Sequence, residues 1–254
     1  MAELDRRFGQ GAAVGRAEAI DQGLRAYMLR VYNYMASGVA LTGIVAWLTY
    51  QAAGGDAIQV SGKAITGMTG FGQALFSLPG MLILFAGTLG FVFLINGMIN
   101  RLQTGQAFLL FLGFAALFGL LLSSIFISFT GASITRVFFI TAASFGGLSL
   151  YGYTTKTDLS PMRSFLVMGL IGIIIAMVVN FFLVSSALQF AISVIGVLIF
   201  AGLTAYDTQQ IKEMYSVNDD GTVSGRKAVM GALRLYLDFI NLFMFLLQLF
   251  GNRR

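Results

Sequence analysis

The sequence contains neither cysteine nor histidine among its 254 residues. Their absence excludes cysteine- and histidine-based zinc sites, iron–sulfur clusters, c-type haem, cysteine nucleophiles and every catalytic arrangement built on imidazole. Charge is also scarce: charged residues make up 11% of the chain, hydrophobic residues make up 57%, and the mean hydropathy is +0.82. So few charges cannot cover a water-soluble globule of this size. The composition therefore excludes a soluble enzyme and indicates a membrane protein.

Apolar runs long enough to cross a membrane recur along the chain. A helix needs about 20 mostly apolar residues to span the hydrocarbon layer. By that measure the sequence predicts an all-α membrane protein with seven transmembrane helices in residues 29–254, preceded by a cytoplasmic tail of residues 1–28. The polar stretches 54–77 and 213–228 are predicted as loops. The predicted spans are residues 29–53, 78–100, 107–129, 134–153, 163–184, 187–209 and 230–250.

The distribution of Lys and Arg predicts the orientation of these helices. With a cytoplasmic amino terminus, 12 of the 16 basic residues lie on the inner side, and Lys63, Arg136, Arg253 and Arg254 lie outside. The net charge of +5 is scattered around the ends of apolar segments, which argues against nucleic acid as a partner. The first residues lack the apolar core of a cleavable signal peptide. We expect a multi-pass protein of the cell (inner) membrane whose main partner is the lipid bilayer.

Two acidic residues lie inside predicted spans, where a charge costs about 2.5 kcal/mol or more. Asp207 is near the inner end of the sixth span in LTAYDTQQIKEMY, and Asp238 is in the inner half of the seventh span in LRLYLDFINLF. Their midpoint falls near residue 222, in a polar turn, so two antiparallel helices would place them at similar depth, where they can meet. Asp238, Asn241 and Gln248 share a sector of about 80° on one helix face. Such a polar face is typical of a helix enclosed by other helices, with Asn241 as a polar support.

Two carboxyl groups held together in a poorly solvated site cannot both ionise easily, so they retain one shared proton. This proton holds the two helices together, and its loss makes them repel unless a cation enters. Carboxylate oxygens suit calcium, although waters or carbonyls must complete its shell of about 6 to 8 oxygens. Arg101, at the inner end of the second span, has the depth of a closed-state counter-ion or of a positive-inside anchor. A purely structural alternative is that Arg234, four residues before Asp238, neutralises it as a helix-end ion pair.

Four stretches of the sequence are similar to one known family: LRAYMLRVYNYMASGVALTG, SLYGYTTKTDLSPMRSFLVMGLIG, IFAGLTAYDTQQIKEMY and LRLYLDFINLF. Through them, and over nearly its whole length, the chain resembles the Bax inhibitor-1 family, the transmembrane Bax inhibitor motif proteins, and within it the bacterial YccA-like branch. The resemblance implies a seventh helix enclosed by the other six. It also implies a pH-sensitive calcium leak with no other cofactor, in which Asp207 and Asp238 form the ion pathway, the pH sensor and the metal ligands. Arg101 is then the positional match to the family's counter-ion on the second helix.

Two other functions stay open. Some bacterial members of the family resemble modulators of a membrane AAA protease of the FtsH type, and a non-transporting partner protein of this kind would have much the same sequence. Intramembrane aspartyl proteases also place two aspartates on adjacent helices, the first in a Tyr-Asp pair like Tyr206-Asp207. Those proteases resemble each other in Gly-x-Gly-Asp and Pro-Ala-Leu motifs, whereas Leu-Tyr-Leu precedes Asp238 here and neither proline is followed by Ala-Leu. We therefore predict that the protein is not an enzyme.

Overall fold

The computed structural model describes residues 2–61 and 64–254, and it describes side chains from residue 21 onward except at 60–64, 96 and 100. Seven helices in this part of the chain are long and apolar enough to cross a membrane, as the sequence predicts. One short antiparallel hairpin accompanies them. The elements are α1 (Ala2–Ala52), η1 (Gly55–Ala57), β1 (Gln59–Ser61), β2 (Ala64–Thr66), α2 (Gly70–Leu75), α3 (Leu78–Met98), η2 (Ile99–Arg101), α4 (Thr104–Leu122), α5 (Ile125–Ser128), α6 (Gly131–Thr154), α7 (Met162–Leu183), α8 (Ser186–Glu213) and α9 (Gly221–Phe250).

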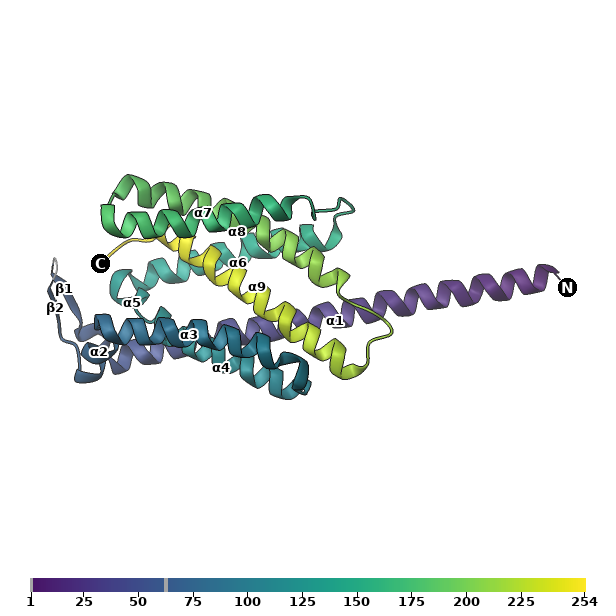
Figure 1. The fold of residues 1–254 in the computed structure, drawn as a ribbon, viewed down its shortest axis with the longest axis horizontal. Coiled ribbons are helices and arrows are strands. Elements are labelled where there is room, and N and C mark those ends of the chain that lie inside the picture. Colours follow the sequence, from purple (N-terminus) through teal and green to yellow (C-terminus); the bar gives the residue numbers. More distant parts are fainter. Residues whose placement is uncertain (1, 62–63) are drawn as a thin grey trace.

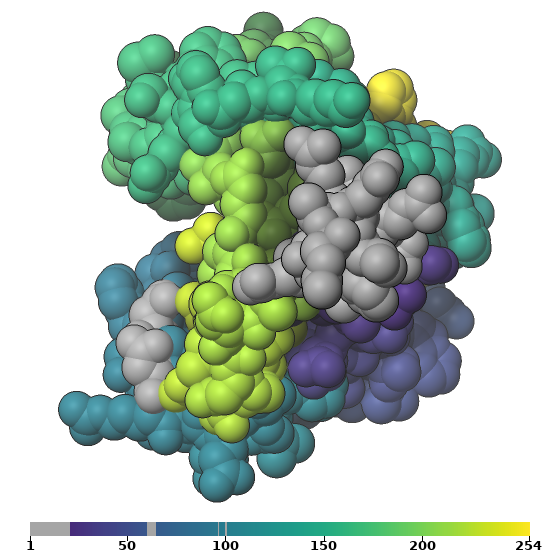
Figure 2. All heavy atoms as spheres, turned by 90° about the vertical axis from the view of Figure 1, so that its right-hand side faces the viewer, coloured from purple at the N-terminus to yellow at the C-terminus, as the bar shows by residue number. Residues whose placement is uncertain are grey.

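Helix α9 lies at the centre of the bundle. In its apolar window 72% of the residues are buried, against 11% in α3 and in α7. Helix α9 contacts α1, α4, α6 and α8, whereas α3 packs on α4 and α7 packs on α8. It runs obliquely between these two groups of helices (Figure 1), and its first turns lie between them when the bundle is viewed from its end (Figure 2). The prediction of an enclosed seventh span is confirmed.

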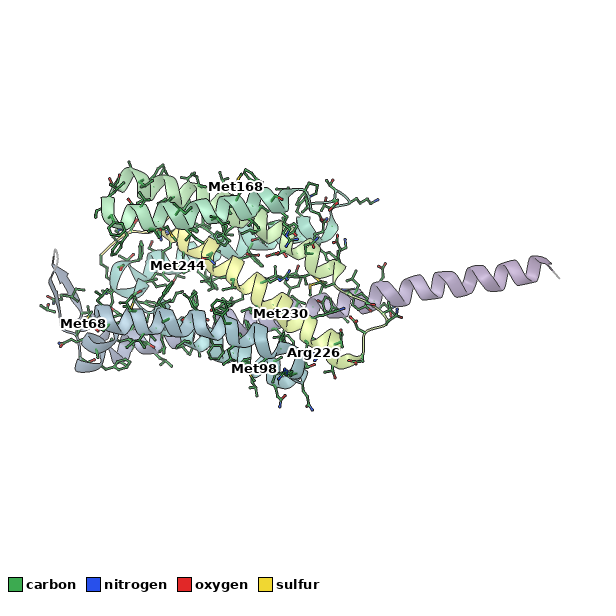
Figure 3. The ribbon with its side chains drawn as sticks, in the orientation of Figure 1. Met68, Met98, Met168, Arg226, Met230 and Met244 are labelled. Atoms are coloured by element: carbon green, nitrogen blue, oxygen red, sulfur yellow. The ribbon has the colours of Figure 1, made fainter. Side chains whose placement is uncertain are left out.

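The outer surface of the bundle is apolar. Met98 on α3 and Met168 on α7 are 45% and 66% exposed, whereas Met230 and Met244 on α9 are partly buried within the bundle (Figure 3). Many large aliphatic and aromatic side chains on α3 and α7 are exposed in the same way. Patches of this size are stable only where the surrounding solvent is hydrocarbon. The bundle is therefore apolar outside because it faces lipid.

Helix α1 continues without a break across the predicted boundary at residue 28. Tyr27 and Met28 are each 3% exposed and belong to the core. The buried part of α1 therefore begins before the predicted span at residue 29. The amino-terminal part of α1 extends beyond the bundle (Figure 1). The assignment of residues 1–28 to a cytoplasmic tail stays a prediction.

The stretch 54–77, predicted as a loop, contains η1, the β1–β2 hairpin and α2. Thr69 ties this segment to the end of α1, because its hydroxyl donates to the Ala52 carbonyl at 2.9 Å. The same Oγ1 accepts the N–H of Gly72 at 3.1 Å and so caps α2. Gly67 has a φ of 79°, and a Cβ there would collide with the Ala57 carbonyl. The segment is therefore folded against the end of α1 by short-range hydrogen bonds that hydropathy does not report.

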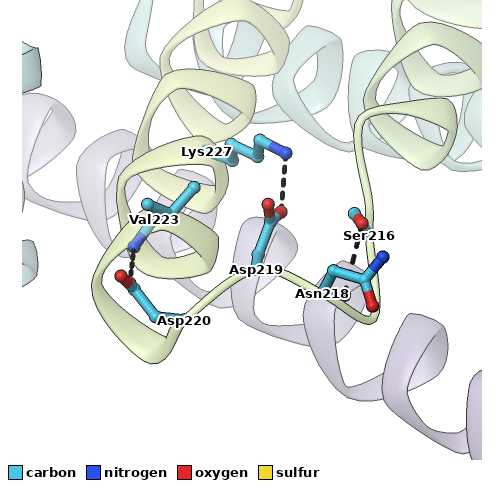
Figure 4. Close-up of polar contacts among 6 residues, drawn as sticks. All are labelled: Ser216, Asn218, Asp219, Asp220, Val223 and Lys227. Carbon is cyan, nitrogen blue, oxygen red and sulfur yellow. Dashed lines mark hydrogen bonds and ion pairs between the residues drawn. The ribbon is translucent and has the colours of Figure 1, made fainter.

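The stretch 213–228, also predicted as a loop, is mostly helical. Helix α8 ends at Glu213 and α9 begins at Gly221, so only residues 214–220 connect them. Asp220 caps α9 by accepting the N–H of Val223 at 2.7 Å, and Asp219 forms an ion pair with Lys227 at 2.6 Å (Figure 4). The predicted loop was too long because the first turns of α9 are polar. A helix that extends beyond the hydrocarbon layer keeps its backbone bonds but loses its apolar signal.

Candidate functional site

The structure brings Asp207 and Asp238 together between α8 and α9. Their side chains interact electrostatically and lie within hydrogen-bonding reach of each other. Asp238 is 5% exposed, and its Oδ2 atom accepts no hydrogen bond from any N–H or O–H donor of the described residues. An ionised carboxylate can only accept, so a hydrogen bond joins the two groups only when one of them carries a proton. The arrangement is that of a carboxyl pair suited to sharing one proton.

Helices α8 and α9 meet along one face of each. On α8, the residues Ser193, Phe200 and Asp207 recur every seven positions, so they lie on the same face of the helix. Asp207 lies beside Asp238, Phe200 stacks on Phe245 with ring centroids 5.7 Å apart, and Ser193 donates to Gln248 Oε1 at 3.1 Å. In these three contacts the residue number increases along α9 as it decreases along α8, as expected of antiparallel neighbours. The common depth of the two aspartates therefore agrees with the equal spacing in the sequence.

An apolar layer separates the carboxyl pair from the far end of the bundle. It contains Phe200 of α8 and Leu242 and Phe245 of α9, which are 6%, 1% and 5% exposed. Gly196 faces the ring of Phe245 so closely that a Cβ at residue 196 would lie 2.6 Å from its Cγ and Cδ1 atoms. The missing side chain lets the two helices approach each other. The buried side chains of this layer therefore pack closely between α8 and α9.

Amide side chains form a polar network beyond the apolar layer. Gln189 Nε2 donates to Gln248 Oε1 at 2.6 Å, and Asn180 Nδ2 donates to Gln189 Oε1 at 3.0 Å. These residues, with Ser193 and Arg253, line a recess of about 780 Å³. It opens at the end of the bundle that the distribution of Lys and Arg predicts to be outside the cell. The α8–α9 interface is thus polar at both ends and apolar between them.

Arg234 is the cation whose charge acts on both carboxyls. It lies one turn before Asp238 on α9 and is exposed, and among the described residues it forms no ion pair within 4 Å with either aspartate. The helix-end salt bridge that would have given Asp238 a purely structural role is therefore not made. Arg234 also acts on Tyr27, whose buried hydroxyl has no hydrogen-bond partner in the described part of the chain.

The structure does not bring the other two predicted residues to the pair. Arg101 is the exposed last residue of η2 and makes no ion pair with either aspartate among the described side chains. Asn241 donates to the carbonyl of Leu237 at 2.8 Å, a bond within its own helix. In this structure Arg234 is the cation that acts on the carboxyls, and the closed-state role of Arg101 stays a prediction. Sequence spacing predicts the depth and the helix face of a side chain but not its hydrogen-bond partner.

Sequence reasoning missed Gly196, Phe200 and Phe245 because each looks like an ordinary residue of an apolar span. One signal could have found the first two. The spacing from Asp207 back to Phe200, Gly196 and Ser193 keeps all four within a sector of about 60° on α8. A glycine between an aromatic and a polar residue on that face indicates a close helix contact.

Two carboxylates are the acidic groups that this site offers to a cation. Among the described residues, no cluster of three or more His, Cys, Asp or Glu side chains could hold a metal ion. Calcium binds about 6 to 8 oxygens in its tight protein sites. The pair therefore suits brief contact with a passing ion better than permanent binding.

These features define a polytopic α-helical membrane protein with an acidic pair beside its central helix. The sequence family described as "Inhibitor of apoptosis-promoting Bax1" matches residues 24–254, which include all seven spans apart from the first residues of α1. The chain belongs to this Bax inhibitor-1 family, and the family predicted from the sequence is confirmed.

Relatives match along nearly the full chain. The protein is 46% identical to the "Inner membrane protein YbhL" of Escherichia coli (strain K12) over 245 residues, which cover 94% of this chain and 98% of the relative. It is 45% identical to the "Uncharacterized protein RP147" of Rickettsia prowazekii over 240 residues, 93% of this chain and 94% of the relative. It is 41% identical to an uncharacterized protein of Caulobacter vibrioides over 259 aligned residues that cover both chains fully.

Proposed function

We propose that this Bax inhibitor-1 family protein is a pH-sensitive calcium leak of the inner membrane, with its amino terminus in the cytoplasm. The observation that carries the proposal is the pair of partly buried Asp207 and buried Asp238 at one end of an apolar layer. The name of the Escherichia coli relative, Inner membrane protein YbhL, supports the location. The orientation with a cytoplasmic amino terminus is supported by the distribution of Lys and Arg, because it places 12 of the 16 on the cytoplasmic side.

The shared proton holds α8 and α9 together, and its loss drives them apart. Two negative charges about 4 Å apart repel by about 4 kcal/mol at an effective dielectric constant of about 20. The stacked rings of Phe200 and Phe245 contribute about 0.5–1.5 kcal/mol beyond the apolar area that they bury. The repulsion arises only in the deprotonated form, so deprotonation shifts the balance toward separation of α8 from α9 and opening of the apolar layer, against the burial of the rings that favours closure.

The direction of the pH dependence follows from proton counting. The charged and titratable groups around the pair are Arg234 on α9 and, next to it, Tyr27 on α1. The closed form binds one proton more than the open form, so a rise in pH favours the open form. Arg234 stabilises the ionised carboxylates and so lowers the pH at which opening occurs. Flux is expected to be small at pH 6 and larger at pH 8.

Calcium, the ion that the family resemblance implies, is compatible with the oxygen atoms along this path. The amide oxygens of Gln189 and Gln248 lie on one side of the apolar layer, and the two carboxylates lie on the other. Both are hard ligands of the kind that calcium prefers. Opening of the layer joins the two polar ends, and the carboxylates become available to the ion when their proton has left.

Calcium flux into liposomes that contain the purified protein tests this function. The wild-type flux should rise between pH 6 and pH 8, and Asp207→Asn or Asp238→Asn should remove that rise. Asp158→Asn is the matched control, because it neutralises an exposed carboxyl in the connection between α6 and α7. A wild-type flux that is equal at both pH values, or a rise that survives both pair substitutions, would contradict the proposal.

A second candidate function is a non-transporting modulator of a membrane AAA protease of the FtsH type. The amino-terminal part of α1 favours it, because this helix extends beyond the bundle where a partner could bind it (Figure 1). Co-purification with such a protease, together with no calcium flux at any pH, would favour this function over the leak. Peptide cleavage that is lost in both aspartate variants would instead indicate an intramembrane aspartyl protease.

A further inference from the structure

A groove of about 560 Å³ runs along the outer surface between α1 and α6; we call it the α1–α6 groove. Helix α1 packs on α4 and α9, and α6 packs on α8 and α9, which leaves the groove between them. A hydrogen bond of 2.7 Å between the hydroxyls of Tyr32 and Ser149 crosses its floor. Its walls include Arg25, Leu29 and Tyr32 of α1 and Gly146, Leu150 and Tyr153 of α6.

The α1–α6 groove lies where one membrane surface meets the hydrocarbon layer. Arg25 lies four residues before the first span predicted from the sequence, which begins at residue 29, and Tyr153 is the last residue but one of α6. Leu29 and Leu150 are 53% and 61% exposed at the sides of the groove, so it opens toward lipid. From Arg25 to Tyr32 it follows α1 for about 10 Å, at about 1.5 Å per residue. That length suits the part of an acyl chain nearest its headgroup.

Positive charge gathers at the polar end of the groove. Arg25 is exposed and forms no ion pair within 4 Å with an acid of the described residues; Asp21 lies one turn earlier on the same helix. Lys212 Nζ donates to the Tyr153 carbonyl at 2.9 Å and lies 5.6 Å from the centre of its ring. A basic group beside an apolar groove at a membrane surface matches an amphiphile with an anionic headgroup.

We propose that the α1–α6 groove binds an anionic phospholipid, with its phosphate against Arg25 and one acyl chain between Leu29 and Leu150. A zwitterionic headgroup adds a cation that Arg25 and Lys212 repel, so the groove selects a net negative charge. Gly146 leaves the space that the chain needs, because a Cβ built there meets nothing within 4 Å.

The groove floor also leads toward the carboxyl pair. Ser149 is hydrogen-bonded to Thr208 at 2.9 Å, and Thr208 directly follows Asp207 on α8. A bound lipid therefore contacts a chain of hydroxyl groups that joins α1, α6 and α8. Lipid binding itself does not depend on whether the protein conducts calcium.

Native mass spectrometry of the full-length protein in detergent tests the site, with phosphatidylglycerol and phosphatidylcholine of identical acyl chains as probes. The wild type should bind phosphatidylglycerol more tightly. Arg25→Gln should weaken that binding about fivefold and leave phosphatidylcholine unchanged. Gly146→Leu should weaken both lipids, because the new side chain fills the groove. Gly147→Leu is its matched control: a Cβ at residue 147 also meets nothing within 4 Å, but this glycine does not line the groove.

The same measurements can overturn the proposal. Equal affinity of the wild type for the two lipids would exclude an anion-selective site, and undiminished phosphatidylglycerol binding by Arg25→Gln would exclude the phosphate contact. Equal binding by Gly146→Leu and Gly147→Leu would exclude the groove. Thermal unfolding of each variant checks that it is folded, so that lost binding is not mistaken for lost structure.

Discussion

Substitution Gly196→Ala tests whether the apolar layer between α8 and α9 is the gate. A Cβ at residue 196 would lie 2.6 Å from the ring of Phe245. Carbon atoms in contact are about 3.5–4.0 Å apart, so the ring or the helices must move by about 1 Å. Phe245 is 5% exposed and stacked on Phe200, which leaves the ring little room. Overpacking of this kind costs about 1–3 kcal/mol, and the cost falls on the closed form because there the helices touch.

A penalty of this size raises the ratio of open to closed protein by roughly 5- to 150-fold. We expect Gly196→Ala to increase calcium flux at pH 6 in liposomes and to lower the thermal stability. Gly202→Ala is the control: on the same helix, its Cβ would meet the flexible end of Leu166 on α7, 2.7 Å away, and not α9. A Gly196→Ala protein that melts at a lower temperature but has wild-type flux at pH 6 would refute the assignment of the gate.

Three further predictions concern the groups around α9. Arg234→Gln removes the cation that favours the ionised pair, so the pH of half-maximal flux should rise, while Arg234→Lys should keep it; an unchanged midpoint would show that Arg234 does not act on the gate. Thr42→Val should destabilise the protein by about 1–3 kcal/mol in chemical unfolding, because it leaves the buried hydroxyl of Tyr236 without its partner at 2.7 Å. Tyr236→Phe should cost only about 0.6 kcal/mol, the average for a hydrogen bond between membrane helices, and equal costs would contradict this reasoning. The chain has no cysteine, so spin labels at Ile195→Cys on α8 and Leu109→Cys on α4, both exposed, should report a longer distance at pH 8 than at pH 6.

The features that sequence predicts well here are those set by the bilayer. The thickness of the hydrocarbon layer fixes the length of each apolar run, so all seven spans appear as counts of apolar residues. The cost of an intramembrane charge makes acids rare, so Asp207 and Asp238 stand out from the other acids without any structural knowledge. The two aspartates lie about equally many residues from the connection between α8 and α9. Antiparallel helices have the same rise per residue, so both aspartates reach the same depth and can meet.

The features that sequence does not predict are those set by rotation and by polar helix ends. Depth predicts Arg101 as the counter-ion and the shared helix face predicts Asn241 as a polar support, but the first is exposed on η2 and the second bonds to its own backbone. The start of α9 was placed at residue 230 although the cap of Asp220 begins the helix at Gly221. The start of a helix depends on single capping hydrogen bonds, and the contacts of a side chain depend on the neighbouring helices. Hydropathy averages over about twenty residues and so reports neither.

The contacts of α9 differ in their chemistry on its two sides, and this difference predicts which helix moves. Toward α1 and α4, Tyr236 is hydrogen-bonded to Thr42, whose own hydroxyl donates to the Ala115 carbonyl at 2.8 Å. The Tyr236 ring also makes edge contacts with three phenylalanines of α4, with centroids 5.5–6.2 Å away. Toward α8, α9 meets Asp207 at the carboxyl pair, stacks Phe245 on Phe200, and accepts hydrogen bonds at Gln248 from Gln189 and Ser193. Of these contacts, the carboxyl pair is the one that can lose a proton. The sequence of α4 contains no ionisable side chain, so we expect the separation of α8 from an α9 that stays anchored to α1 and α4.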